Sequence, residues 1–244
     1  MAALLSLTDV NKSFGALKVA DDVTFEMPEG QALGIIGPNG AGKSTLFNLI
    51  GGTLPVSSGT VVFDGTDVTA LSASERCRMG VSRSFQIPHP FVGMSVYENL
   101  LVASSFGNSG HRDAMAECRD ILARTGLLPL ANNPAGSLTL LQRKRLELAR
   151  ALASGPKLLL LDEIAGGLTE AECHDLVATI NAIKASGVSI IWIEHIVHAL
   201  TAVVDRLIVI DFGRIVAEGA PDTVMKDPMV QEIYMGIEVD DDAA

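Results

Sequence analysis

Three features of the sequence predict an α/β fold. A glycine-rich loop joins a strand-like run at residues 32–36 to a helix-like run at residues 46–50. A second continuous apolar run, 157–161, ends in two carboxylates, as a strand buried on both faces of a parallel sheet does. The stretch 87–154 between them reads as mostly helical. We therefore expect an α/β core with an antiparallel β segment ahead of the loop and a helical insertion within the core.

The loop follows the pattern G-x-x-x-x-G-K-[ST] in a strand–loop–helix setting. Its residues are Gly37, Pro38, Asn39, Gly40, Ala41, Gly42, Lys43, Ser44 and Thr45. The glycines let successive backbone N–H groups point at one anion, and the following helix adds its positive dipole end. In this pattern Lys43 reaches the β- and γ-phosphates and Ser44 reaches Mg²⁺. The loop therefore predicts a nucleotide site, although a plain glycine-rich turn has the same composition.

Composition narrows the possible partners. The net charge of the 244-residue chain is −11, and its longest basic run is Arg143-Lys144-Arg145, so we expect no nucleic-acid partner. No apolar run approaches the roughly 20 residues that span a bilayer, so a membrane role requires a partner.

Three cysteines without paired spacing indicate reduced thiols that serve in packing, namely Cys77, Cys118 and Cys173.

Two short strands, 4–10 and 23–27, precede the loop, and a turn is expected between them at 11–15. They predict an antiparallel segment that leads into the loop strand. Phe14 lies at its end, where an aromatic ring either stacks on an adenine or packs into the core.

After the loop helix, glycines and a proline at 51–55 predict a stop, and 60–63 reads as a strand. One or two helical turns at 74–80 then lead into a predicted strand, 81–86, which ends in Gln86. An amide there can accept from a metal-bound water and donate to a phosphate, although a glutamine at a strand end is often only a surface residue.

Helical patterns at 95–106 and 113–124 follow Pro88 and Pro90. A further helix, 138–152, begins with Thr139, which can cap it. The N-terminus of that helix can present N–H groups to an anion; alternatively, the helix is simply amphipathic with a basic, solvated face. We expect one domain, 1–244, in which 1–86 and 155–244 form the core and 87–154 forms a helical subdomain.

The two carboxylates after the apolar run are Asp162 and Glu163. Because the carboxyl ends of parallel strands form the ligand-binding edge of an α/β sheet, we expect both side chains near the loop. Asp162 is placed to hold Mg²⁺ through water, and Glu163 to accept a proton from an attacking water. The alternative is an Asp-Glu turn without chemistry.

A capping box at 169–172 starts the next helix, whose apolar residues recur at three- and four-residue spacing as far as Ile183. The strand 188–193 then ends in Glu194-His195, so His195 falls in line with the other polar strand ends. A lone histidine is otherwise usually structural. The runs 206–211 and 214–217 predict a last β pair.

In this order the motifs resemble the nucleotide-binding subunit of an ABC transporter, most closely the branched-chain amino acid importer ATPases. The similarity covers essentially the whole chain and implies a P-loop NTPase (RecA-like) core that hydrolyses ATP with Mg²⁺. The matching positions are Gly37 to Thr45 (P-loop), Gln86 (Q-loop), Leu138 to Gln142 (signature), Leu158 to Asp162 (Walker B) with Glu163 as catalytic base, Gly167-Leu168-Thr169 (D-loop) and His195 (switch histidine).

The resemblance also implies an assembly. Two ATPase subunits, identical or homologous, pack head to tail, and each ATP lies between one P-loop and the partner's signature helix, which assigns Thr139 and Gln142 to ATP binding. Phe14 matches the adenine-stacking position. Two membrane permease subunits are implied as direct partners and a solute-binding protein as an indirect one. The expected location is the cytoplasmic face of the inner (plasma) membrane, as a peripheral subunit.

The chain departs from the family pattern at several positions. The signature L-S-G-G-Q has leucines for both glycines, Leu140 and Leu141, and Thr139 for the serine. Side chains therefore crowd a backbone that approaches the γ-phosphate closely, and we expect weak ATP-induced dimerisation. Ile164 stands where a proline usually follows the glutamate, and Thr169 replaces the common D-loop acid.

The leading functional hypothesis is the motor of an importer. The ending 227–236 resembles the D-P-x-V-x-x-x-Y-[LM]-G tail of branched-chain amino acid importer ATPases, which favours such an amino acid or a similarly small polar solute. The alternatives are a lipopolysaccharide-type exporter ATPase and a soluble ABC ATPase without a transport role. A module that binds ATP without turnover is disfavoured because Lys43, Asp162, Glu163 and His195 are all present.

Overall fold

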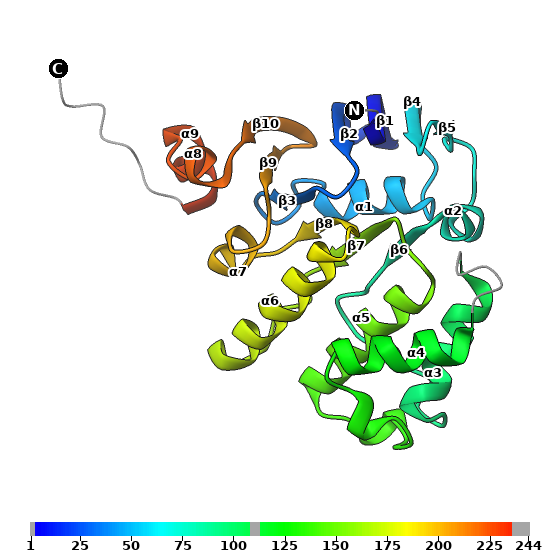
Figure 1. Ribbon diagram of the computed structural model, residues 1–244. Coiled ribbons are helices and arrows are strands. Elements are labelled where there is room, and N and C mark those ends of the chain that lie inside the picture. Colours follow the sequence, from blue (N-terminus) through cyan, green and yellow to red (C-terminus); the bar gives the residue numbers. More distant parts are fainter. Residues whose placement is uncertain (1–2, 108–112, 236–244) are drawn as a thin grey trace.

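Two β-sheets enclose one helix in the computed structural model, which describes residues 3–107 and 113–235 (Figure 1). The first sheet is antiparallel, with strand order β2-β1-β4-β5. Its strands are β1 (Ala3–Phe14), β2 (Leu17–Pro28), β4 (Ser58–Phe63) and β5 (Thr66–Asp67). The predicted antiparallel lead-in to the loop strand is therefore confirmed.

The turn expected at 11–15 is wrong. Strand β1 continues to Phe14, which pairs with Leu17, and the chain reverses only at Gly15 and Ala16. This polar stretch can pair with β2 because the Asn11 side chain spans an irregularity in the register of the two strands. Its amide donates to Asp22 Oδ1 at 2.8 Å and accepts from the Asp22 backbone N–H at 3.0 Å. The side chain therefore supplies hydrogen bonds that a regular ladder would have supplied.

The second sheet carries the loop strand and has the order β10-β9-β3-β8-β7-β6. All neighbours except β9 and β10 are parallel. Its strands are β3 (Ala32–Ile36), β6 (Val81–Arg83), β7 (Leu158–Asp162), β8 (Ser189–Ile193), β9 (Arg206–Asp211) and β10 (Arg214–Gly219). Every residue of β3, β7 and β8 is buried, which explains why the strands read as apolar runs rather than as alternating patterns.

Strand β6 is shorter than predicted. It ends at Arg83 rather than at Gln86. The last sheet-like bond is donated by the Ser84 N–H to the carbonyl oxygen of Leu160, at 2.9 Å. The chain then leaves the sheet toward Pro88 and Pro90, which have no N–H to donate, so Gln86 lies in a loop.

Helix α1 (Lys43–Gly51) lies between the two sheets (Figure 1). Its Phe47 is fully buried in one apolar cluster with Leu7 of the antiparallel sheet and with Ile35 and Leu160 of the parallel sheet. The helix that follows the loop is thus held on both sides by β-structure.

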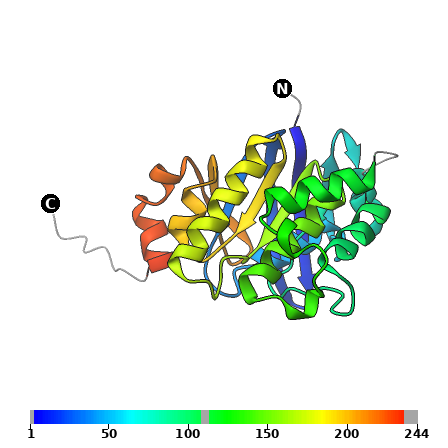
Figure 2. The ribbon, with the colours of Figure 1, turned by 60° about the horizontal axis from the view of Figure 1, so that its bottom comes forward.

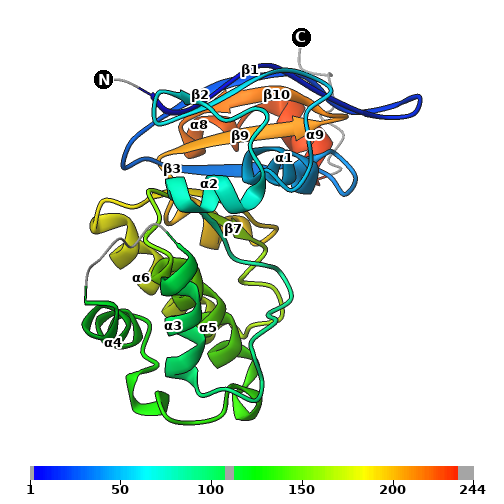
Figure 3. The same ribbon diagram turned by 90° about the vertical axis from the view of Figure 1, so that its right-hand side faces the viewer.

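The remaining long helices lie on the other face of the parallel sheet or beyond it (Figures 2 and 3). They are α3 (Val96–Phe106), α4 (Ala114–Arg124), α5 (Leu140–Ala153) and α6 (Glu170–Ala185). The shorter helix α2 (Ala73–Met79) instead lies beside α1, where the Arg76 guanidinium donates to the carbonyl oxygens of Leu49 and Ile50. The capping box predicted for α6 is confirmed, since the Thr169 N–H donates to Glu172 Oε2 and the Glu172 N–H to Thr169 Oγ1. The boundaries expected for the helical subdomain, 87–154, stay a prediction.

Short helices complete the chain: α7 (Val197–Thr201), α8 (Pro221–Val224) and α9 (Pro228–Met235). Val230 of α9 is fully buried, whereas Gly236, the last residue of the tail motif, lies outside the described residues, as does the side chain of Tyr234. None of the helices within 3–107 and 113–235 has both the length and the apolarity to cross a bilayer.

The burial of Phe47 generates a stability prediction. Phe47→Ala should lower the free energy of unfolding by about 3–5 kcal/mol, because it leaves a cavity between two sheets. Phe212→Ala is the matched control: its ring is 85% exposed, so the change should stay within about 0.5 kcal/mol. Urea denaturation followed by circular dichroism measures both, and equal effects would contradict the central position of α1.

Candidate active site

The candidate site lies at the carboxyl edge of the parallel sheet. There the glycine-rich loop follows β3, Asp162 ends β7 with Glu163 directly after it, and His195 follows β8. Because β8 lies between β3 and β7, these groups meet at one edge. The structure therefore brings together the loop, both carboxylates and the histidine that the sequence singled out.

The loop is shaped by close contact with the neighbouring backbone. Gly37 and Gly42 have φ angles of 152° and 106°. A Cβ atom on Gly37 would collide with the carbonyl oxygen of Ile210, and one on Gly42 with that of Val19. Only glycine fits these two positions, because both the conformation and the space exclude a side chain.

Lys43 begins α1 and is only 6% exposed. Its ammonium donates to the carbonyl oxygens of Gly37 at 2.7 Å and Pro38 at 2.9 Å, so it points back under the loop. Burial lowers the pKa of Lys43, while the nearby charges of Glu163 and Asp162 favour its charged form. Residues 39–45, Val19 and Glu163 line a hollow of about 190 Å³ over the loop.

Glu163 links the predicted residues on the side of this hollow. Its Oε2 accepts a hydrogen bond from Gln86 Nε2 at 2.5 Å, and its Oε1 lies 2.6 Å from Nε2 of His195. The carboxylate is therefore held from two loops that are far apart in sequence. A carboxylate fixed beside a histidine at the mouth of an anion-binding loop is suited to orient and deprotonate a water.

Asp162 has a partner that the sequence reading missed, Arg83. The guanidinium lies 2.5 Å from Asp162 Oδ2 and donates to Asn48 Oδ1 at 2.6 Å. It also stacks near the rings of Phe47 and Phe85, 5.6 and 5.3 Å from their centroids. The signal in the sequence was an arginine inside an otherwise buried strand, which requires a partner.

The oxygen donors at the edge fit Mg²⁺. A serine hydroxyl, a carboxylate and an amide oxygen are the hard ligands this ion takes, and Ser44, Asp162 and Gln86 supply them. Within the described part of the chain, no cluster of three His, Cys, Asp or Glu residues could hold a metal ion.

Three nucleotide-binding residues predicted from outside the loop do not line the hollow. Thr139 and Gln142 form a capping box at the start of α5, in which the Thr139 N–H donates to Gln142 Oε1 at 3.0 Å. Phe14 lies at the end of β1, with its ring 52% exposed and the Lys12 ammonium 5.2 Å from the ring centroid. Whether these residues bind nucleotide stays a prediction.

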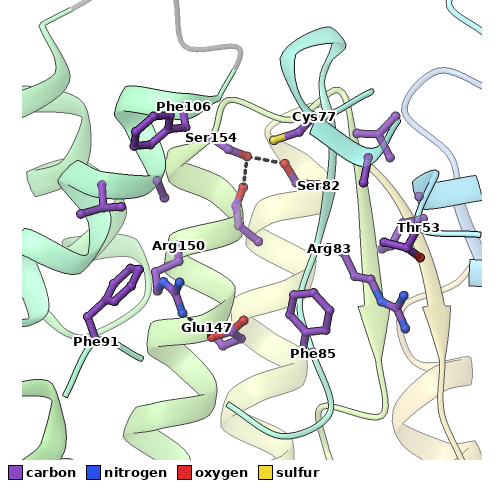
Figure 4. A pocket seen from close by; sticks show the side chains of 17 residues that line it. Thr53, Cys77, Ser82, Arg83, Phe85, Phe91, Phe106, Glu147, Arg150 and Ser154 are labelled. Carbon is purple, nitrogen blue, oxygen red and sulfur yellow. Dashed lines mark hydrogen bonds and ion pairs between the residues drawn. The ribbon is translucent and has the colours of Figure 1, made fainter. Parts of the chain in front are cut away.

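A groove of about 330 Å³ opens beside the loop that carries Gln86 (Figure 4). Phe85, Phe91 and Phe106 line it and are 48%, 45% and 74% exposed. Glu147 and Arg150 of α5 form an ion pair of 2.9 Å in it. Burial raises the pKa of Glu147, and the Arg150 charge opposes that shift. None of these five residues was singled out from the sequence.

The chain is similar in sequence and in fold to several known proteins. The ABC transporter family model matches residues 20–166. The chain is 33% identical over 250 residues to the high-affinity branched-chain amino acid transport ATP-binding protein BraF of Pseudomonas aeruginosa, covering 96% of this chain and 98% of that protein. It is 30% identical over 239 residues to the lipopolysaccharide export system ATP-binding protein LptB of Escherichia coli, with 96% and 98% covered. A crystal structure of an ATP-binding cassette of an ABC transporter in its ADP conformation is similar with a TM-score of 0.89 at 34% identity, covering 97% of this chain and 100% of that chain.

The Arg83–Asp162 pair generates a prediction. Both side chains are largely buried, 15% and 9% exposed, so Arg83→Met should lower the free energy of unfolding by about 3 kcal/mol because it leaves a buried carboxylate without its cation. The control is Lys157→Met, whose pair with Asp64 is 44% and 51% exposed and should contribute at most about 1 kcal/mol. Chemical denaturation of both variants checks the difference, and a loss below 1 kcal/mol for Arg83→Met would refute the assigned role.

Proposed function

The chain belongs to the ABC transporter family of ATP-binding proteins, and from this premise we propose that its ATP hydrolysis powers an importer of a branched-chain amino acid or a similarly small polar solute. The single observation that supports the hydrolytic role best is the carboxylate of Glu163, held between Gln86 and His195 beside the phosphate-binding loop. The likeness to BraF and the tail motif support the choice of solute.

Within this proposal each side chain at the edge has a role. Lys43 and the loop N–H groups hold the phosphates, and Ser44, Asp162 and Gln86 hold Mg²⁺. When bound, Mg²⁺ would supply positive charge that offsets the negative charge of the phosphates. Glu163 accepts a proton from the attacking water, and His195 orients both this carboxylate and the γ-phosphate. The hydrogen bonds to Glu163 keep the base near the phosphate before water attacks.

A second subunit completes the site in the same proposal. Thr139 and Gln142 at the start of α5 face the nucleotide of the partner, to which the helix N-terminus offers N–H groups. Leu140, next to Thr139, is 49% exposed, so the start of α5 is accessible to a partner, although this side chain crowds the close approach that glycine would allow. Phe14 stacks on the adenine, for which an exposed ring at the end of a hairpin is suited.

The groove beside Gln86 is the proposed docking site for a membrane permease subunit. Exposed aromatic side chains cluster there, namely Phe85, Phe91 and Phe106, and such a patch usually marks an interface. The loop that forms one wall also carries Gln86, which bonds to Glu163. A helix seated in the groove would therefore sense the state of the catalytic carboxylate through one loop.

An exporter is the second candidate. The likeness to LptB, 30% identical over 96% of this chain, favours it, and the chemistry of Glu163 is the same for either direction of transport. We choose import because the identity to BraF is slightly higher and because the tail motif resembles importer ATPases.

Removal of the base tests the hydrolytic role. Glu163→Gln should bind ATP within a few-fold of the parent affinity but lose about 10²- to 10⁴-fold in turnover, the usual contribution of a general base. Phosphate release and titration with a fluorescent ATP analogue measure the two quantities. Glu29→Gln, at an exposed turn, is the matched control and should change neither. Turnover within a few-fold of the parent would contradict the role of Glu163.

Gene deletion tests the transport role. A strain without this gene should lose uptake of labelled leucine or of a related small amide such as urea, and the parent gene should restore it. Phe106→Asp, which places a charge in the groove, should not restore uptake because a permease helix cannot bury that charge. Normal uptake of every solute in the deletion strain, with loss of an exported lipid, would overturn the importer assignment in favour of export.

A further inference from the structure

Two buried charged residues beside Glu163 have no role in the mechanism above. Lys144, on the second turn of α5, is 5% exposed, and Glu194, directly after β8, is 1% exposed. Lysine and glutamate are almost never fully buried unless they are paired with other groups. Burying each of these charges costs solvation free energy. The hydrogen bonds of the two side chains show which parts of the structure they stabilise in return.

Glu194 joins the segment after Glu163 to the segment that carries His195. Its Oε1 accepts from the Ala165 N–H at 2.7 Å, and its Oε2 accepts from the His195 N–H at 2.9 Å. Burial raises the pKa of Glu194, and these two N–H groups oppose the shift. One carboxylate thus fixes the backbone on both sides of the Glu163–His195 contact.

Lys144 reaches the same segment from the helical part of the molecule. Its ammonium donates to the carbonyl oxygen of Ile164 at 2.9 Å, in a buried position. Burial lowers the pKa of Lys144, while the charges of Glu194 and Glu163 favour its cationic form. In Figure 3, α5 lies below the sheet that contains β7, so this contact crosses between the two parts.

The segment that these residues hold is strained. Glu163 has a φ angle of 46°, in the left-handed region that residues other than glycine rarely adopt. Its own N–H donates to the carbonyl oxygen of Ile193 at 2.9 Å, ahead of the bonds at Ile164 and Ala165. Such a conformation persists only where the surroundings fix it. Three consecutive residues are therefore held by a strand, a lysine and a carboxylate.

We propose that Lys144 and Glu194 are positioning residues, which hold the backbone of Glu163 in the conformation from which its carboxylate meets Gln86 and His195. Because Lys144 belongs to α5, the position of the catalytic carboxylate depends on how this helix is seated against the sheet. The inference rests on the proposed role of Glu163 as the base. The competing explanation is that Lys144 serves only to stabilise the fold.

The test compares three variants of the full chain. Lys144→Met removes the ammonium and keeps the length of the side chain, and Lys144→Arg keeps a cationic donor. Lys184→Met is the matched control, since the ammonium of Lys184 on α6 also donates to a backbone carbonyl, that of Val203 at 2.8 Å, before β9 and away from Glu163. For each variant we would measure kcat for ATP hydrolysis, the Kd for ATP and the melting temperature.

A misplaced carboxylate affects turnover more than binding, so Lys144→Met should lower kcat by about 10- to 100-fold while the Kd for ATP changes by less than about threefold. Lys144→Arg should recover most of the activity. Lys184→Met should keep the parent kcat even if it melts earlier. If Lys144→Met does not fold, Glu194→Gln, which can no longer accept both N–H bonds, replaces it with the same expected split between kcat and Kd.

Two results would overturn the inference. One is a folded Lys144→Met with a kcat within about threefold of the parent, because the expected misplacement costs more than that. The other is a double variant, Lys144→Met with Glu163→Gln, whose loss of kcat equals the two single losses combined. The effects of residues that act as a unit are not additive, so Lys144→Met should lower kcat little further once the base is gone. An active Glu163→Gln would instead refute the proposed base itself, so the two failures are distinguishable.

Discussion

The pairing of three adjacent parallel strands determines where all the candidate chemistry lies. Strand β8 bonds to β3 on one side and to β7 on the other, so the ends of all three strands are fixed relative to one another. Lys43, Asp162 and His195 follow those ends or lie close to them, and none could shift alone without breaking a ladder. The rigid sheet thus sets the distances, while the loops after the strands supply the side chains.

Polar burial at this edge is compensated locally. Lys43 donates to its own loop, Asp162 pairs with Arg83, and Glu194 accepts two backbone N–H groups. An isolated buried charge would cost several kcal/mol of stability, or the group would become neutral by gaining or losing a proton. Each of these contacts reduces that cost. The site is therefore a set of mutually supporting charges, with Glu163, whose side chain is 18% exposed, at its open side.

Sequence patterns predicted the parts of this structure that depend on local chemistry. The loop motif, the apolar strands, the capping box and the family resemblance were all readable because neighbouring residues specify them. The pairs Arg83–Asp162 and Lys144–Ile164 were missed because their partners are 79 and 20 residues apart and share no spacing rule. The end of β6 and the long hairpin were misjudged for a related reason, since hydrogen bonds to other strands decide where a strand stops.

The position of β3 in the sheet has a consequence for synthesis on the ribosome. Both of its neighbours, β8 (Ser189–Ile193) and β9 (Arg206–Asp211), lie more than 150 residues further along the chain. The loop strand leaves the ribosome early and has no ladder to join until about four-fifths of the 244 residues have been made. During that interval its five apolar residues are a target for aggregation or for chaperones, and the nucleotide site cannot form on the nascent chain.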